Sequence, residues 1–376
     1  MSETPSAPET ASAESSSAAT PPAKRLFSPA LVLACVAVGA VVFAIAWSQI
    51  NSPAVAGRGV DFDRTLNSLG LGSPVSNKLG DAFTDSDQDL VVDTPSDAAA
   101  LRDPDTLKFC FLSENAGNVD PAMWQPLMDA ISQATGKPVE YASFATADDQ
   151  MLALRDGGLD ITLFNTGNVP RAVNAAGFVP VASPSVQSEP ASYNMLILTK
   201  ADSDIKAVED LRGHRLALTR YGSNSGYKAP LVLLKELGLE PERDYDFAFS
   251  GSHDNSIKGL ADGSVKADAV AVASDLFAAA IERGEVKEDA FTVVYESEAF
   301  PRAAFGMAHS LKPELAQSIQ DTVLSFQFAG TSLQAQFPDS DGFSPLAYKD
   351  SFALIRRIDD AVGFKHEIKT EVPTAQ

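Results

Sequence analysis

The sequence predicts an α/β protein of two lobes joined by two crossings of the chain. Strand-like apolar runs alternate with helix-like segments from about residue 107, the order typical of a parallel sheet covered by helices. An extended run over residues 191–199 interrupts this alternation, and a second alternating set follows it. After Phe300 and Pro301 the chain is expected to return to the first lobe. Two sheets joined by two crossings predict a hinged clamp.

The first lobe is predicted from apolar runs and helix signals. Residues 107–112 form a compact apolar run of the kind found in strands. Asp120 and Pro121 are typical of a helix start, and apolar residues at helical spacing continue from Met123 to Ile131. The expected elements are a strand at 107–112, a helix from 120 to about 134, a strand at 139–144, a helix at 147–156 and a strand at 160–164.

The second lobe repeats this alternation, and the end of the chain adds two helices to the first lobe. The expected elements are strands at 216–219, 247–250, 269–272 and 292–295, and helices from about 225, at 253–260, at 276–283, at 313–328 and at 348–360. The predicted boundaries are 106–195 and 300–364 for lobe 1, 196–299 for lobe 2 and 365–376 for a tail.

The residues before the first predicted strand fall into three segments. Residues 1–25 lack apolar periodicity and predict a disordered cytoplasmic tail. Residues 26–50 contain an uncharged apolar run long enough to cross a bilayer, and the preceding Lys24 and Arg25 place the N-terminus in the cytoplasm. Residues 51–105, rich in Asp, Ser, Gly, Asn and Pro, predict a tether with one helix near 62–71.

The fate of the apolar segment stays open at this point. An uncleaved transmembrane anchor fits its length, whereas Ala54-Val55-Ala56 matches the processing site of a cleaved signal segment. Lipidation at Cys35 fits less well, because further apolar residues follow that cysteine. In each case the folded part is expected to be exported to the periplasm or its extracytoplasmic equivalent, and the anchored form would be held at the inner membrane.

Composition excludes several classes of protein. Fifty acidic residues against 29 basic ones give a net charge of −21, which argues against a nucleic-acid partner. The two cysteines, Cys35 and Cys110, imply no disulfide framework. No cluster of residues has metal-ligand spacing and no phosphate or dinucleotide loop is present, so we expect neither a metal nor a cofactor.

Two short polar turns at helix starts are the candidate binding elements. The first, Tyr221–Tyr227, contains Ser223 and Ser225, whose hydroxyls can donate to an oxyanion, and Gly226, which lets the backbone approach it. The second turn, 250–253, ends in His253, which can donate an imidazole N–H. Backbone N–H groups and the positive end of the helix dipole converge at such starts, so the two turns predict a cradle for a small oxyanion. Alternatively, Ser225 is only a helix cap and His253 only a structural residue.

The opposing side of the site is expected at the strand ends of the first lobe. In open α/β sheets ligands bind at the carboxyl ends of strands. This rule selects Glu114, Thr146, Asn165 and Thr166 as candidate contacts.

An enzyme is the main rival class. Residues 222–226 superficially match the hydrolase elbow Gly-x-Ser-x-Gly, but Asn224 occupies the nucleophile position. Cys110 lies inside an apolar strand and is expected to be a small buried hydrophobe. We therefore expect no catalytic residues and no enzymatic activity.

From about residue 107 to 363 the chain resembles the periplasmic solute-binding proteins of phosphate, phosphite and phosphonate ABC transporters. The order and spacing of several short motifs carry the resemblance: Leu154–Ile161, Tyr193, Asp210–Gly213, Ser223–Gly226, Gly251–His253 with Gly263, Asp268 and Ala269, and Phe300–Arg302. The resemblance implies a type II periplasmic-binding-protein fold with two crossover strands, a phosphorus oxyanion clamped between the lobes and delivery to a membrane permease.

The resemblance also guides the site and the ligand. It favours ligand contacts at Ser223, Asn224, Ser225, Gly226, Tyr227 and His253. Asn224 stands where threonine is usual in the family, and the sequence does not place the acidic pair that amine-bearing phosphonate binders use. We therefore expect a monomer that binds phosphate, phosphite or a small phosphonate. A membrane-anchored ligand sensor with the same fold remains the alternative function.

Overall fold

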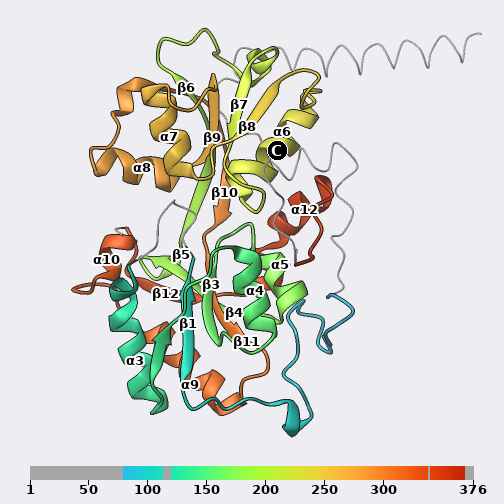
Figure 1. Ribbon diagram of the computed structural model, residues 1–376, viewed down its shortest axis with the longest axis vertical. Helices are drawn as coiled ribbons and strands as arrows, with labels where there is room; N and C mark the ends of the chain where they lie inside the picture. The colour runs from blue at the N-terminus through green and yellow to red at the C-terminus, as the bar shows by residue number, and fades with distance from the viewer. Residues whose placement is uncertain (1–78, 113–119, 338, 369–376) are drawn as a thin grey trace, which may run out of the picture. The chain divides into compact units, whose positions relative to one another are not determined.

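The computed structural model describes residues 79–112, 120–337 and 339–368 (Figure 1). They all fall within one compact unit that begins at Ala56. The predicted tail 1–25, apolar segment 26–50 and helix near 62–71 lie outside the described residues. Within the described ranges, no helix has the length and apolar character needed to span a membrane.

The first lobe is built on a seven-stranded sheet. Its strands are β1 Leu107–Phe111, β2 Val139–Tyr141, β3 Ile161–Phe164, β4 Phe178–Val186, β5 Glu189–Pro190, β11 Ala304–Ala308 and β12 Gly342–Pro345. They lie in the order β12-β4-β11-β3-β1-β2, with β5 paired to β4. β1 pairs in parallel with β2 and β3, whereas β11 pairs antiparallel with β3 and β4. The sheet is therefore mixed rather than parallel.

Helices cover both faces of this sheet. They are α3 Gln125–Thr135, α4 Ala147–Arg155, α5 Val169–Ala176, α9 Pro313–Ser325, α10 Leu333–Gln336, α11 Tyr348–Ser351 and α12 Ala353–Ala361. Figure 1 shows α3 and α9 on one side of the sheet and α4 and α5 on the other. A 3-10 turn, Pro121–Trp124, precedes α3, because Asp120 caps it and Pro121 needs no hydrogen-bond acceptor there.

The second lobe is built on a five-stranded sheet in the order β10-β6-β9-β7-β8. Its elements are β6 Ser192–Lys200, β7 Arg215–Leu218, a π-turn Asn224–Lys228, α6 Ala229–Glu236, β8 Asp246–Phe249, α7 His253–Asp262, β9 Ala269–Ala273, α8 Ser274–Glu282 and β10 Phe291–Pro301, with short 3-10 turns at Val208–Leu211 and Glu288–Ala290. In Figure 1, α7 and α8 lie on one side of this sheet and α6 on the other.

The strands β6 and β10 carry the chain between the two sheets. β6 leads from the first lobe into the second, and β10 leads back to β11. They pair antiparallel along their length, from Phe291 opposite Lys200 to Pro301 opposite Ser192. The prediction of two crossings is thus confirmed, although the return strand is much longer than the expected 292–295.

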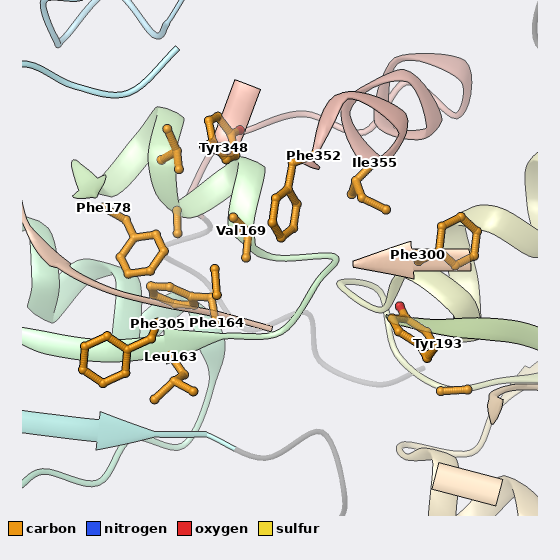
Figure 2. Packing of buried hydrophobic residues seen from close by; sticks show 14 of the residues in the cluster. Leu163, Phe164, Val169, Phe178, Tyr193, Phe300, Phe305, Tyr348, Phe352 and Ile355 are labelled. Carbon is orange, nitrogen blue, oxygen red and sulfur yellow. The ribbon is translucent and has the colours of Figure 1, made fainter. Parts of the chain in front are cut away.

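Buried aromatic residues hold the first lobe together. Phe164 and Phe178 meet edge to face with their ring centroids 4.9 Å apart. Figure 2 shows Phe352 of the C-terminal segment beside Val169, and Ile355 belongs to the same cluster of buried residues, which extends into the second lobe. The final helix α12 also contacts α6 and the π-turn of the second lobe, so it lies where the two lobes meet.

Three expectations about this part of the chain need correction. The expected strand 139–144 ends at Tyr141, and the closing helix 348–360 is broken at Phe352, whose ψ of 11° leaves the helical region. The expected tether 51–105 is packed in its described part, because Leu79, Leu90 and Val92 are buried in the main core cluster.

Candidate functional site

A cavity of about 480 Å³ is lined by residues of both lobes. Its polar and charged lining includes Asn165, Thr166, Ser192, Asn194, Asn224, Ser225, His253, Ser274, Asp275, Glu282, Arg302 and Asp339. Apolar side chains such as Phe111, Leu276 and Phe337 complete the wall. A concave, mostly apolar cavity with a few converging polar groups is the usual form of a small-molecule site.

The first polar turn forms one wall of this cavity. Ser223 is the cap of the π-turn, since its Oγ accepts a hydrogen bond of 3.2 Å from the Gly226 N–H. Gly226 packs so tightly that a Cβ there would lie 2.0 Å from Thr219 Oγ1. A helix start leaves its first amides without intrahelical acceptors, and Asn224 and Ser225, which supply such amides, line the cavity. The alternative interpretation of Ser225 as a helix cap is wrong, because Ser223 takes that role.

His253 connects the second polar turn to the first. It begins α7, follows the cap Ser252 and is only 1% exposed. Its Nδ1 accepts a hydrogen bond of 3.1 Å from the Ala273 N–H, so the ring hydrogen of the neutral tautomer belongs on Nε2. Nε2 lies 3.2 Å from Ser223 Oγ and donates to it. The imidazole therefore fixes the two turns to each other.

Asn224 brings a partly unsatisfied amide to the cavity. Its Nδ2 donates a long hydrogen bond of 3.4 Å to the Tyr193 hydroxyl. Its Oδ1 is buried and has no partner among the described residues. Since buried polar atoms in proteins normally have partners, an unpaired one in a cavity wall indicates a place for a ligand.

The opposing wall follows the carboxyl end of β3. Asn165 and Thr166 line the cavity, and Thr166 Oγ1 donates to the Pro301 carbonyl over 2.8 Å. The next residue, Gly167, touches the first polar turn of the other lobe. A Cβ on Gly167 would lie 2.1 Å from Gly222 O and 2.7 Å from Asn224 N. Only glycine fits where the two lobes meet.

Charged side chains also line this cavity. Arg302 makes a two-pronged ion pair with Asp339, with N–O distances of 2.9 and 2.6 Å, and its Nε lies 3.3 Å from Asp275 Oδ2. Glu282 adds a third carboxylate to the cavity lining. Burial raises the pKa of Asp275 against the opposing effect of Arg302, whereas hydrogen bonds from Arg302 lower the pKa of Asp339. This part of the cavity is acidic.

Residues 109–351 match the protein family described as "ABC transporter, phosphonate, periplasmic substrate-binding protein". The chain belongs to this family. It is a substrate-binding protein of a phosphonate-type ABC transporter and not an enzyme, so both predictions from the sequence are confirmed by the family match.

Solved structures have the same fold as this substrate-binding protein. XAC2383 from Xanthomonas citri bound to ATP is 21% identical with a TM-score of 0.58, over 69% of this chain and 100% of that one. PhnD1 from Prochlorococcus marinus in complex with methylphosphonate is 14% identical with a TM-score of 0.59, over 70% and 100%. A binding protein component of an ABC phosphonate transporter from Pseudomonas aeruginosa is 19% identical with a TM-score of 0.55, over 65% and 82%.

A curated relative matches over a shorter region. Transferrin from Blaberus discoidalis is 30% identical over 99 residues, which is 26% of this chain and 14% of the transferrin. This match covers too little of either protein to inform the site.

The structure brings together half of the predicted site residues of this substrate-binding protein. Asn165, Thr166, Asn224, Ser225 and His253 line the cavity. Ser223 and Gly226 lie directly behind its wall, held by the hydrogen bonds and contacts described above.

The other predicted residues lie elsewhere or are not described. Tyr227 packs between Tyr221 and Phe249, with ring centroids 5.4 and 5.6 Å away. Thr146 is outside the cavity lining and caps α4 by accepting from the Asp149 N–H. Glu114 lies outside the described residues.

The charged residues of the cavity were not among the site residues predicted from the sequence. Arg302 belongs to one of the motifs that carry the family resemblance, but no ligand contact was predicted for it. Asp275 is the second residue after β9, so the strand-end rule that selected Asn165 would also have selected it if applied to the second lobe. Asp339 had no comparable signal, because it meets Arg302 only through the tertiary fold.

Proposed function

We propose that this protein captures a phosphorus oxyanion between its lobes and delivers it to its ABC permease. The first polar turn, with Asn224 and Ser225, and His253 behind it provide the oxyanion end of the site, while Asn165 and Thr166 face them from the other lobe. The observation that carries the proposal is the His253 hydrogen bond to Ser223, because it unites the two helix starts at one cavity wall. PhnD1, which shares the fold, was solved with methylphosphonate.

We also propose that residues 26–50 anchor the protein to the inner membrane, with the binding domain on the periplasmic side. The uncharged apolar run and the basic pair before it support this arrangement.

The ligand is an organophosphonate that carries an amine. A cavity of about 480 Å³ is much larger than a tetrahedral oxyanion needs. Its acidic part, with Asp275, Glu282 and Asp339 against Arg302, repels a second anionic group and attracts a cation. This proposal narrows the expected set of phosphate, phosphite or a small phosphonate to the last of the three, with an amine added.

A thermal-shift series with the purified protein tests the ligand class. We expect 2-aminoethylphosphonate to raise the melting temperature more than methylphosphonate, phosphate, phosphite or sulfate at equal concentration, because only it offers both charges. The preference for the amine is the ratio of the dissociation constants of methylphosphonate and 2-aminoethylphosphonate. Asp275→Asn should reduce this ratio by about 5- to 150-fold, which corresponds to a coupling free energy of about 1–3 kcal/mol. The exposed Asp289 provides the control, since Asp289→Asn changes the net charge equally outside the cavity. Equal shifts of the melting temperature with 2-aminoethylphosphonate and methylphosphonate would reject the proposal that the ligand carries an amine. No shift with any phosphorus compound would reject the proposed function.

A further inference from the structure

A fully buried lysine joins the binding turn to the other lobe. Lys228, the last residue of the π-turn, pairs with Asp359 on α12, and both side chains are 0% exposed. Lys228 Nζ also donates a hydrogen bond of 2.8 Å to the Gly167 carbonyl and lies 4.4 Å from the centre of the Phe364 ring. A buried ammonium needs such partners, because an unpaired buried charge is strongly unfavourable.

The two partners of Lys228 are both connected to the first lobe, Gly167 directly and Asp359 through His366. Gly167 follows Asn165 and Thr166, which line the cavity. Asp359 lies on α12, whose Ile355 and Ile358 are buried in the main cluster. His366 supports the carboxylate, with Nε2 placed 2.8 Å from Asp359 Oδ2 and Nδ1 placed 2.6 Å from Asn174 Nδ2 of α5. The Gly167 carbonyl is thus part of the first lobe, whereas the Asp359 carboxylate lies on a helix that contacts the second lobe and is linked to α5 of the first.

The ammonium itself belongs to the other lobe. Lys228 ends the five-residue π-turn that begins with Asn224 and Ser225 at the cavity wall. A displacement of either lobe therefore changes the distance from Nζ to Gly167 O. The contacts of Nζ are buried and involve a charged group, so their loss when the lobes separate costs free energy.

We propose that Lys228 is a positioning residue for ligand binding, which holds the binding turn against the Asn165–Gly167 wall by its hydrogen bond to the Gly167 carbonyl while its ion pair with Asp359 keeps the buried ammonium charged and in place. Together these contacts favour the closed arrangement of the lobes, in which both walls face the ligand. Their removal raises the fraction of open molecules and weakens ligand affinity without touching the ligand-lining residues. The affinity part of this inference rests on the proposed function, whereas the effect on lobe closure does not.

The decisive variant is Lys228→Met with Asp359→Leu. Replacing one partner alone leaves a buried charge and endangers folding, whereas apolar residues of similar size at both positions preserve stability. The matched control is Lys108→Met with Glu140→Gln, which removes an exposed ion pair within the first lobe.

Two measurements on the full chain in lipid nanodiscs test the inference. Spin labels at Gln133→Cys on α3 and Ala261→Cys on α7, both exposed positions, report the distance between the lobes without ligand. The background carries Cys35→Ser, and Cys110 is buried with its thiol pKa raised to about 12, so it escapes labelling. Titration with 2-aminoethylphosphonate and with methylphosphonate gives the dissociation constants and the dissociation rates of the two ligands.

We expect the Lys228→Met/Asp359→Leu protein to show a larger share of long distances than the control. We also expect its dissociation constant for a bound phosphonate to rise about tenfold or more, mainly through faster dissociation. Unchanged distances overturn the inference, and so does an unchanged dissociation constant in a protein whose parent binds. If the protein without these substitutions binds neither phosphonate, the proposed function fails. The distances between the spin labels then decide alone whether Lys228 favours the closed arrangement.

Discussion

Gly167→Ala is expected to weaken phosphonate binding by about 5- to 150-fold while the unliganded protein stays folded. The new methyl group would lie 2.1 Å from Gly222 O, and this neighbour is backbone that cannot rotate away. Such overpacking costs about 1–3 kcal/mol. The cost falls on the closed arrangement, because an opening of the lobes relieves the contact. Calorimetric titration of the variant with 2-aminoethylphosphonate, alongside thermal melting without ligand, measures both effects.

Gly158→Ala is the matched control for this variant. It adds the same methyl group to the same lobe, but its nearest neighbour is 3.6 Å away, an ordinary van der Waals contact. Wild-type affinity in Gly167→Ala, or an equal loss in Gly158→Ala, would contradict the close approach of the lobes at Gly167.

His253→Ala is expected to lower both ligand affinity and stability. The change removes the acceptor of the Ala273 N–H and the donor to Ser223, both in buried surroundings. An unsatisfied buried group costs about 1–3 kcal/mol of unfolding free energy. The first polar turn loses its fixed position, so we expect the dissociation constant to rise about tenfold or more. Urea unfolding and calorimetric titration give the two quantities.

His253→Gln separates positioning from simple loss of volume. A carboxamide carries one acceptor and one donor, as the neutral imidazole does here. We expect Gln to recover part of the affinity that Ala loses. Equal affinity of the Ala and Gln variants would show that the hydrogen bonds of His253 do not position the turn.

The sequence predicts elements well where local signals agree. The helix at 147–156 and the start of α7 at His253 carry side-chain caps, Thr146 and Ser252, and both begin where expected. By contrast, no strand was predicted at β4, which contains Pro180 and Pro184. Proline normally argues against a strand inside a sheet, and here tertiary pairing with β11 and β12 overrides that preference.

The site shows the same division between local and tertiary signals. Ser225 and His253 are recognisable because each stands in a turn next to a helix start. Lys228 gave no signal, because its partner Asp359 lies 131 residues further along the chain. Charge pairing over such a separation depends on the completed fold, and no spacing rule in one sequence reveals it.

The position of β11 determines the order in which the polypeptide can complete its two halves. The whole second sheet lies between residues 192 and 301, so a nascent chain holds every strand of it before Ala304 is synthesised. The first sheet instead needs β11 between β3 and β4, which do not pair with each other. Until that late strand arrives, the early strands keep exposed edges, which are prone to aggregation. An exported chain of this topology therefore depends most on protection of its N-terminal strands during synthesis.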